Sequence, residues 1–411
     1  MLLIKNIGVL QTPIGKSSLR GSAQAQNLKL KNAAILIDNG KISAIYGDGE
    51  LPDLSSYARL KVIDAQNLLV TPGLVDCHTH TVFGGWRQSE IPLKLRGATY
   101  LDILKAGGGI LDTVRHTREA SEDDLYNKSK GFIEEMLSYG VTTVESKSGY
   151  GLNLYDELKQ LKVNKRLNET TPMEVVSTFL GAHAIPPEYA GNPDGYIDYL
   201  CKEVLPEVKR QNLAEFCDVF CEDAVFDAEQ SKKLLICARE LGLKSKIHAD
   251  EIEAIGGSLL AGQLGAISAE HLIAIDERGM DSLKKGGVTA ALLPATSFYL
   301  NKAYAPARKM IEKGISVAIA SDFNPGSCPS LNLQFAINLG YLKYRMLPEE
   351  ILTATTLNAA CAIGRGESIG SIEVGKQADL VIWDAPDFEM ICYRFGVNQV
   401  KSVIKKGEIL N

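Results

Sequence analysis

The sequence has few of the features that mark membrane, secreted or nucleic-acid-binding proteins. Apolar runs in its 411 residues end within about a dozen positions, short of the ~20 that a bilayer requires. We expect no signal peptide, because no charged segment followed by an apolar core and a cleavage site opens the chain. Lysine and arginine total 44 against 50 acidic residues, so the net charge of −6 leaves no basic excess for nucleic acid or an anionic membrane. These absences favour chemistry on small molecules.

Cysteine is present, but its spacing predicts neither a disulfide framework nor a zinc ribbon. The eight cysteines are scattered, and most lie in apolar segments, which is typical of reduced, buried thiols in a cytoplasmic protein. Cys217 and Cys221 have no second pair after them and therefore do not predict a zinc site. With 45% hydrophobic and 23% charged residues, the composition is that of an ordinary globular protein.

Both ends of the chain are rich in short β-type runs. A strong hairpin signal, Asp38-Asn39-Gly40-Lys41, separates two of the runs near the N-terminus. We expect residues 1–70 and 366–411 to form one small composite β-sandwich domain. The runs are 2–9, 33–38, 41–46, 380–383 and 400–404.

The central segment, residues 71–365, alternates short apolar strands with amphipathic helices. One such helix is expected between Ser121, a good N-cap, and Gly140. This alternation predicts βα units on a parallel sheet, and eight repeats of it favour an α/β fold of the TIM-like (β/α)8 barrel type. An open doubly wound sheet fits the same pattern. The expected strands end near His78, Lys147, Ala182, Glu222, His248, His271, Pro294 and Asp322.

Residues 83–113 are too many for an ordinary βα connection. They include Gly84-Gly85-Trp86-Arg87 and the triplet Gly107-Gly108-Gly109, which lacks the flanking residues of a phosphate-binding loop. Long connections in a compact domain are often lids or ligand-binding loops, and we expect that role here.

The positions of the histidines are the main functional signal. Five of the six lie at expected strand ends, and only His116 lies in a helical pattern. His78 and His80 share one face of a strand, and the ends of barrel strands meet at one mouth. His248 and Asp322 end two other strands, so that three imidazoles and a carboxylate suit one divalent ion, Zn²⁺ or Fe²⁺. Taken alone, a histidine at a strand end is more often a hydrogen-bonded structural residue than a ligand, and an aspartate there often caps a helix.

Local motifs place this pattern in a known group. The chain resembles the metal-dependent amidohydrolase superfamily through PGLVDCHTH (72–80), IDNGKISAIYG (37–47), HADE (248–251), SAEH (268–271) and GSIEVGKQADLVIWD (370–384). Within it, the chain is most similar to the imidazolonepropionase family of histidine degradation, through FGGWR (83–87), GGGI (107–110), ESKSGYG (145–151), FLGAHAIP (179–186) and SDFNPGS (321–327).

The resemblance implies a reaction and a set of site residues. The reaction is hydrolysis of the cyclic amide of 4-imidazolone-5-propanoate, with one Zn or Fe ion. The metal ligands fall on His78, His80, His248 and Asp322. The substrate contacts fall on Arg87, Tyr150, His183, Glu251, Asn324, Gly326 and Ser327. Catalytic proton transfer and oxyanion stabilisation fall on Glu251, His271 and Asp322, with their division left open.

Several alternatives remain at this point. Lys147 suggests the carboxylated lysine that bridges two metals in some relatives, but that lysine usually comes from a middle strand, where this chain has Glu222. Other functions on the same scaffold are a different cyclic-amide hydrolase, a nucleobase aminohydrolase or a non-catalytic interaction protein. Arg87 and Tyr150 favour a small substrate with a carboxylate tail. We expect no nucleic-acid or membrane partner and a possible homodimer.

Overall fold

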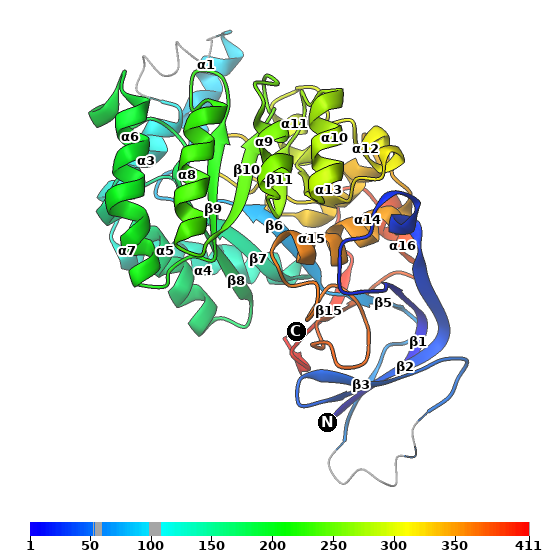
Figure 1. Ribbon diagram of the computed structural model, residues 1–411. Helices are drawn as coiled ribbons and strands as arrows, with labels where there is room; N and C mark the ends of the chain where they lie inside the picture. The colour runs from blue at the N-terminus through cyan, green and yellow to red at the C-terminus, as the bar shows by residue number, and fades with distance from the viewer. Residues whose placement is uncertain (52, 54–59, 98–107, 411) are drawn as a thin grey trace.

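The computed structural model describes residues 1–51, 53, 60–97 and 108–410, in which the strands form two eight-stranded sheets (Figure 1). One sheet is a nearly closed parallel barrel with the order β13-β12-β11-β10-β9-β8-β7-β6. The (β/α)8 prediction is therefore confirmed. The barrel strands are β6 (Leu74–Thr79), β7 (Val141–Lys147), β8 (Glu174–Ala182), β9 (Phe216–Cys221), β10 (Lys244–Ala249), β11 (Ser268–His271), β12 (Thr289–Leu292) and β13 (Val317–Ile319).

The first and last barrel strands meet through the residues that follow them. The amide of Asp322 donates to the carbonyl of His78 at 3.1 Å, and the amide of His80 donates to the carbonyl of Phe323 at 2.8 Å. Two backbone hydrogen bonds thus close the barrel beside three of the residues expected to bind metal.

Helices surround the barrel and bury their apolar faces against it (Figure 1). Ser121 caps α4 by accepting from the Asp124 amide, as the sequence predicts, and Gly314 ends α12 with a φ of +85°. In the described part of the chain, no helix combines the length and the apolar character needed to cross a bilayer. The main helices are α4 (Glu122–Ser138), α5 (Leu154–Thr170), α6 (Pro193–Tyr199), α7 (Leu205–Arg210), α8 (Ala228–Glu240), α9 (Gly257–Leu264), α10 (Glu277–Gly286), α11 (Pro294–Tyr299), α12 (Ala307–Lys313), α13 (Leu333–Leu342), α14 (Pro348–Thr355), α15 (Leu357–Ala362) and α16 (Phe388–Tyr393).

The second sheet joins the two ends of the chain, and both termini lie beside it (Figure 1). It mixes antiparallel and parallel pairs, and β5 crosses the expected domain boundary at residue 70, so the exact boundaries stay a prediction. The Trp383 indole donates to the Thr71 hydroxyl at 2.8 Å and anchors this sheet where the chain enters the barrel. Its strands are β1 (Leu2–Pro13), β2 (Asn27–Asp38), β3 (Lys41–Tyr46), β4 (Lys61–Asp64), β5 (Leu69–Pro72), β14 (Leu380–Trp383), β15 (Val400–Lys405) and β16 (Glu408–Ile409).

The long connection after β6 contains short helices in its described residues. These are η3 (Gln88–Glu90), α1 (Ile91–Leu95) and α3 (Ile110–Glu119), while Gly107 of the glycine triplet lies outside the described residues. Gly84 and Gly85 pack against His116, where an added Cβ would come within 2.4 and 2.7 Å of that residue. The two glycines therefore permit a close approach between the connection and α3.

Candidate functional site: a metal centre at the barrel mouth

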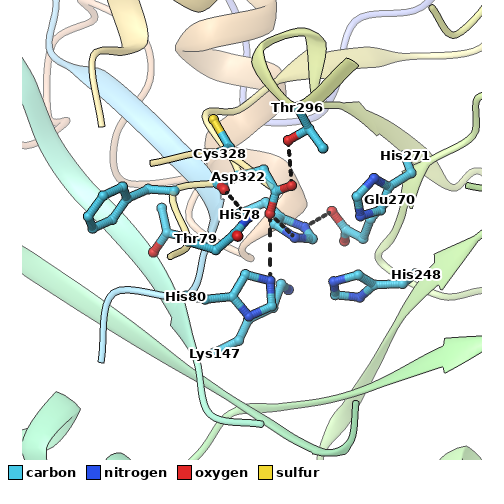
Figure 2. Close-up of polar contacts among 12 residues, drawn as sticks. His78, Thr79, His80, Lys147, His248, Glu270, His271, Thr296, Asp322 and Cys328 are labelled. Atoms are coloured by element: carbon cyan, nitrogen blue, oxygen red, sulfur yellow. Dashed lines mark hydrogen bonds and ion pairs between the residues drawn. The ribbon is translucent and has the colours of Figure 1, made fainter. Parts of the chain in front are cut away.

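Four histidines and one aspartate converge at the C-terminal end of the barrel (Figure 2). His78 and His80 come from the end of β6, His248 from β10 and His271 from β11, while Asp322 follows β13. The His78 ring lies 4.6 Å from the His248 ring and 5.3 Å from the His80 ring. The structure thus brings together the four predicted metal ligands, of which Asp322 is also a predicted catalytic residue, and the predicted catalytic residue His271.

The donor set fits a divalent metal ion. His78 Nε2, His248 Nε2 and His271 Nδ1 are buried and have no hydrogen-bond partner among the described residues, and His80 turns its Nε2 toward Asp322. Asp322 Oδ1 lies 3.5 Å from His78 Nε2 and 3.6 Å from His80 Nε2, longer than hydrogen bonds. Buried polar atoms normally have partners, so this concentration of unpaired nitrogens around a carboxylate indicates an ion site.

The local electrostatics favour the metal-binding form of two imidazoles. Burial holds the pKa values of His78 and His80 well below their usual range, and nearby positive groups add to the shift. Burial also lowers the pKa of His248, but the Asp218 carboxylate outweighs it and the net shift is upward. Two of the three expected imidazole ligands are therefore neutral, which is the form that binds metal.

Two carboxylates behind the site hold the imidazole rings. Glu270 Oε2 lies 2.9 Å from His78 Nδ1 and pairs with it (Figure 2). Asp218 Oδ2 lies 3.0 Å from His248 Nδ1, and its other oxygen accepts the His248 amide at 3.1 Å. Carboxylates placed in this way fix the orientation of metal-binding histidines and make them better ligands.

A layer of buried charge supports these carboxylates inside the barrel. Lys147 Nζ lies 2.7 Å from Glu145 Oε1 and 2.8 Å from Asp218 Oδ2. Burial lowers the pKa of Lys147, but the surrounding carboxylates outweigh it and raise the pKa overall, so the amine is a cation. Lys246 Nζ lies 3.4 Å from Glu270 Oε1. Each of the two carboxylates behind the site, Asp218 and Glu270, thus has a lysine beside it.

The backbone is strained at the strand ends that carry the site. His271, Leu272 and Asp322 have φ values of +69°, +57° and +57°, in the left-handed region that non-glycine residues seldom adopt. Such conformations persist where the surrounding structure enforces them, and they concentrate at functional sites.

Three of the predicted substrate residues lie beside the candidate ligands. The His183 ring stacks on the His80 ring at 4.8 Å, and its Nδ1 lies 3.1 Å from the carbonyl of Gly149. The Tyr150 ring is 5.8 Å from the His80 ring, and burial raises the pKa of its hydroxyl. Glu251 Oε2 lies 3.6 Å from His271 Nε2, which places two candidate catalytic groups next to each other.

The turn after Asp322 is built around one amide side chain. Asn324 Oδ1 accepts from the amides of Gly326 at 2.9 Å and Ser327 at 2.7 Å, so these two backbone donors are already paired. Arg87 reaches this turn, because a Cβ on Gly326 would lie only 2.0 Å from Arg87 Nη1. The structure therefore groups Arg87 with Asn324, Gly326 and Ser327, while their roles toward substrate stay predictions.

Some residues of this site do not follow from the histidine pattern. Glu270 and Asp218 lie behind the predicted ligands, and Glu90 pairs with Arg87. Glu222 accepts hydrogen bonds from the amides of Ile252 at 2.9 Å and Glu253 at 3.1 Å. One sequence signal was available for two of them, because Asp218 and Glu270 lie inside short buried strands, where a charged residue is rare unless it is paired.

Comparison with known proteins adds an independent line of information. The Amidohydrolase family model matches residues 223–410. An imidazolonepropionase of Caldanaerobacter subterraneus is 51% identical over 98% of this chain and 96% of its own length, and one of Fusobacterium nucleatum is 50% identical over 100% and 98%. A zinc-bound adenosine deaminase of Xanthomonas campestris superposes with a TM-score of 0.68 at 21% identity, covering 99% of this chain and 92% of the deaminase. A guanine deaminase of C. acetobutylicum superposes with a TM-score of 0.69 at 17% identity, covering 100% and 99%. The last two similarities concern the fold alone.

Proposed function

Because the chain belongs to the imidazolonepropionases of the amidohydrolase family, we propose that its barrel mouth is the active site of this hydrolase. The reaction opens the cyclic amide of 4-imidazolone-5-propanoate to N-formimidoyl-L-glutamate, a step of L-histidine degradation. The clustering of four histidines with Asp322, with buried ring nitrogens that have no hydrogen-bond partner among the described residues, is the observation that carries this proposal.

One divalent ion, Zn or Fe, would be held by His78, His80, His248 and Asp322. Such an ion, when bound, makes hydroxide available near neutral pH and polarises a carbonyl oxygen. A single ion is favoured because Lys147 is occupied as a cation between Glu145 and Asp218, so its amine is not available as a carboxylated bridge between two ions.

Two residues of the chain carry the proton transfers, and a third stabilises the developing charge. Asp322 accepts a proton from the attacking water, since its carboxylate lies among the metal ligands and burial raises its pKa. Glu251 passes a proton to the ring nitrogen that leaves, and its side chain, 15% exposed, can reach a bound ring. His271 donates a hydrogen bond to the carbonyl oxygen, where negative charge develops.

The remaining predicted residues bind the substrate. Arg87 pairs with the propanoate carboxylate, because a guanidinium offers two parallel donors to a planar anion. Tyr150 and His183 face the ring beside His80, and the predicted contacts of the Asn324 turn lie beside Arg87. A nucleobase aminohydrolase is not favoured, since the charge of Arg87 has no counterpart on a neutral base.

Other properties follow from the same proposal. The substrate is a small molecule, and a cytoplasmic location is supported by eight unpaired cysteines. A homodimer is supported by large apolar side chains that stay exposed on and beside α11, α13 and α16: Phe298, Tyr341, Tyr393 and Phe395.

The direct test follows the absorbance of imidazolone propanoate with protein expressed in zinc- or iron-supplemented medium. We expect the absorbance to fall and about one equivalent of metal to copurify. Protein that carries full metal but leaves imidazolone propanoate intact would contradict the assigned substrate. Protein with less than about a tenth of an equivalent would contradict the metal site.

A further inference from the structure

Arg87, the proposed anchor of the substrate carboxylate, is already held by another side chain of the same connection. Its Nε donates to Glu90 Oε1 at 2.8 Å, and its Nη2 donates to Glu90 Oε2 at 3.1 Å. The two side chains are 16% and 3% exposed. This is a bidentate pair in a largely buried setting, which restricts the guanidinium to one plane.

The geometry of the pair leaves a defined part of Arg87 available. A guanidinium can bind carboxylates along two edges, and Glu90 occupies the edge formed by Nε and Nη2. Nη1 points to the turn after Asp322, where the missing side chain of Gly326 provides its space. The edge formed by Nη1 and Nη2 is therefore the one that Glu90 leaves open, and its Nη1 lies beside the group of predicted substrate residues.

Glu90 is itself fixed from a second direction. Its Oε1 also accepts the amide of Gly109 at 2.7 Å, and Gly109 is the residue before α3. The carboxylate thus joins η3, which carries it, to the start of α3. Because Oε1 is held by the backbone of Gly109 as well as by Arg87, the carboxylate does not simply follow Arg87 when Arg87 moves, so it acts as a fixed support.

We propose that Glu90 is a positioning residue that orients Arg87 and thereby sets selectivity for a substrate with a carboxylate tail. This inference rests on the proposed function of Arg87. The negative charge of Glu90 weakens the attraction of Arg87 for another anion. The Glu90 carboxylate also holds the long, flexible Arg87 side chain in the geometry that a planar substrate carboxylate needs. The orienting effect outweighs the charge effect because both oxygens and both nitrogens of the pair are engaged.

Kinetics of Glu90→Gln, Arg87→Ala and the double variant test this role. We expect Glu90→Gln to raise KM for imidazolone propanoate about tenfold, to change kcat less than about twofold and to leave the metal content unchanged. Glu90→Asp keeps the charge and should recover part of the affinity. Glu119→Gln, an exposed carboxylate on α3, is the matched control and should behave as the unmodified protein.

The double variant separates orientation of Arg87 from support of the fold. If Glu90 acts through Arg87, Glu90→Gln adds no further rise in KM once Arg87 is alanine. An equal rise in KM in both backgrounds would overturn the proposal, as would an unchanged KM in Glu90→Gln alone.

A binding measurement keeps this test independent of turnover. An imidazole with the same propanoate tail has no amide bond to hydrolyse, and its affinity is measured by calorimetry. We expect Glu90→Gln to weaken its binding about tenfold in protein that retains Arg87, and to have no further effect in protein that carries Arg87→Ala. Absence of turnover in the unmodified protein would contradict the proposed function, whereas equal affinity in the Glu90 variants would contradict the role of Glu90.

Discussion

Lys147 and His248 share one carboxylate oxygen inside the barrel. Asp218 Oδ2 lies 2.8 Å from Lys147 Nζ and 3.0 Å from His248 Nδ1, and both the lysine and the aspartate are fully buried. The lysine therefore sets the charge around a proposed metal ligand without touching the ion. This arrangement links the stability of the barrel to the metal site.

Removing the lysine should destabilise the barrel. In Lys147→Met, the carboxylates of Glu145 and Asp218 lose their buried cation, and we expect the free energy of unfolding to fall by about 3–5 kcal/mol. Urea unfolding followed by circular dichroism measures this loss. Lys130→Met removes only an exposed lysine 3.8 Å from Glu134 and should cost less than about 0.5 kcal/mol. Equal midpoints for the two variants would show that the buried pair does not stabilise the fold.

The carboxylate behind His78 should control metal affinity more than stability. In Glu270→Gln the acceptor at His78 Nδ1 loses its charge, so we expect the metal to bind about 10–100-fold more weakly. Competition with a chelator, followed by metal analysis, gives the affinity. Retention of metal at the unmodified level would mean that Glu270 only balances the charge of Lys246.

Loss of a direct ligand should have a larger effect. We expect His248→Ala to lose both bound metal and turnover, because it removes the only predicted ligand that comes from β10. Metal content and activity are measured on the same preparation. His116→Ala, which removes a half-buried histidine of α3 that is not among the proposed ligands, should keep both. Metal retained in His248→Ala would contradict the ligand set proposed here.

Gly326 should be required for binding of the carboxylate tail. Its alanine variant would place a Cβ 2.0 Å from Arg87 Nη1, so the guanidinium must move. We expect Gly326→Ala to raise KM at least about tenfold while metal content stays the same. Gly131→Ala is the control, because its Cβ would meet no atom within 4 Å. An unchanged KM would show that Arg87 binds the substrate from another position.

Acid should weaken one contact between α10 and α12. Hydrogen bonds from Lys309 and Lys313 lower the pKa of Glu277 to about 2, from the usual 4.5. A lowered pKa in the folded state means that the stabilisation is present above pH 4.5 and is lost as the pH falls toward 2. The difference in thermal midpoint between the unmodified protein and Glu277→Gln should therefore shrink over this interval, and a constant difference would contradict the ion pair. Added salt should reduce it at neutral pH.

The sequence was sufficient for the barrel and for the group of candidate ligands. Strands that are buried on both faces appear in the sequence as short apolar runs. The C-terminal ends of the parallel strands of a barrel lie at one mouth, so histidines at those ends had to meet. The fold prediction is confirmed, and the structure places His78, His80, His248 and Asp322 together as the pattern predicts. Their roles as ligands stay a prediction.

The supporting residues could not be predicted in the same way. A charged residue such as Asp218 or Glu270 inside an apolar strand indicates an inward-facing polar group, but its partner lies on another strand whose register is not encoded locally. Lys147 shows the difficulty, because its position suggested a bridge between metals and the structure gives it two carboxylates instead. The pairing of Arg87 with Glu90 depends on side-chain rotamers in an irregular connection, where no periodic pattern helps.

The closure of the barrel also determines when the site can exist during folding. The hydrogen bonds between Ser321 and Asp76 join residues 245 positions apart, next to the proposed ligands His78 and Asp322. Contacts of such long sequence separation form late, because the chain must first order the segment between them. A chain still being synthesised therefore cannot assemble the complete ligand set until its last barrel strand has emerged, and acquisition of metal would report that the barrel is complete.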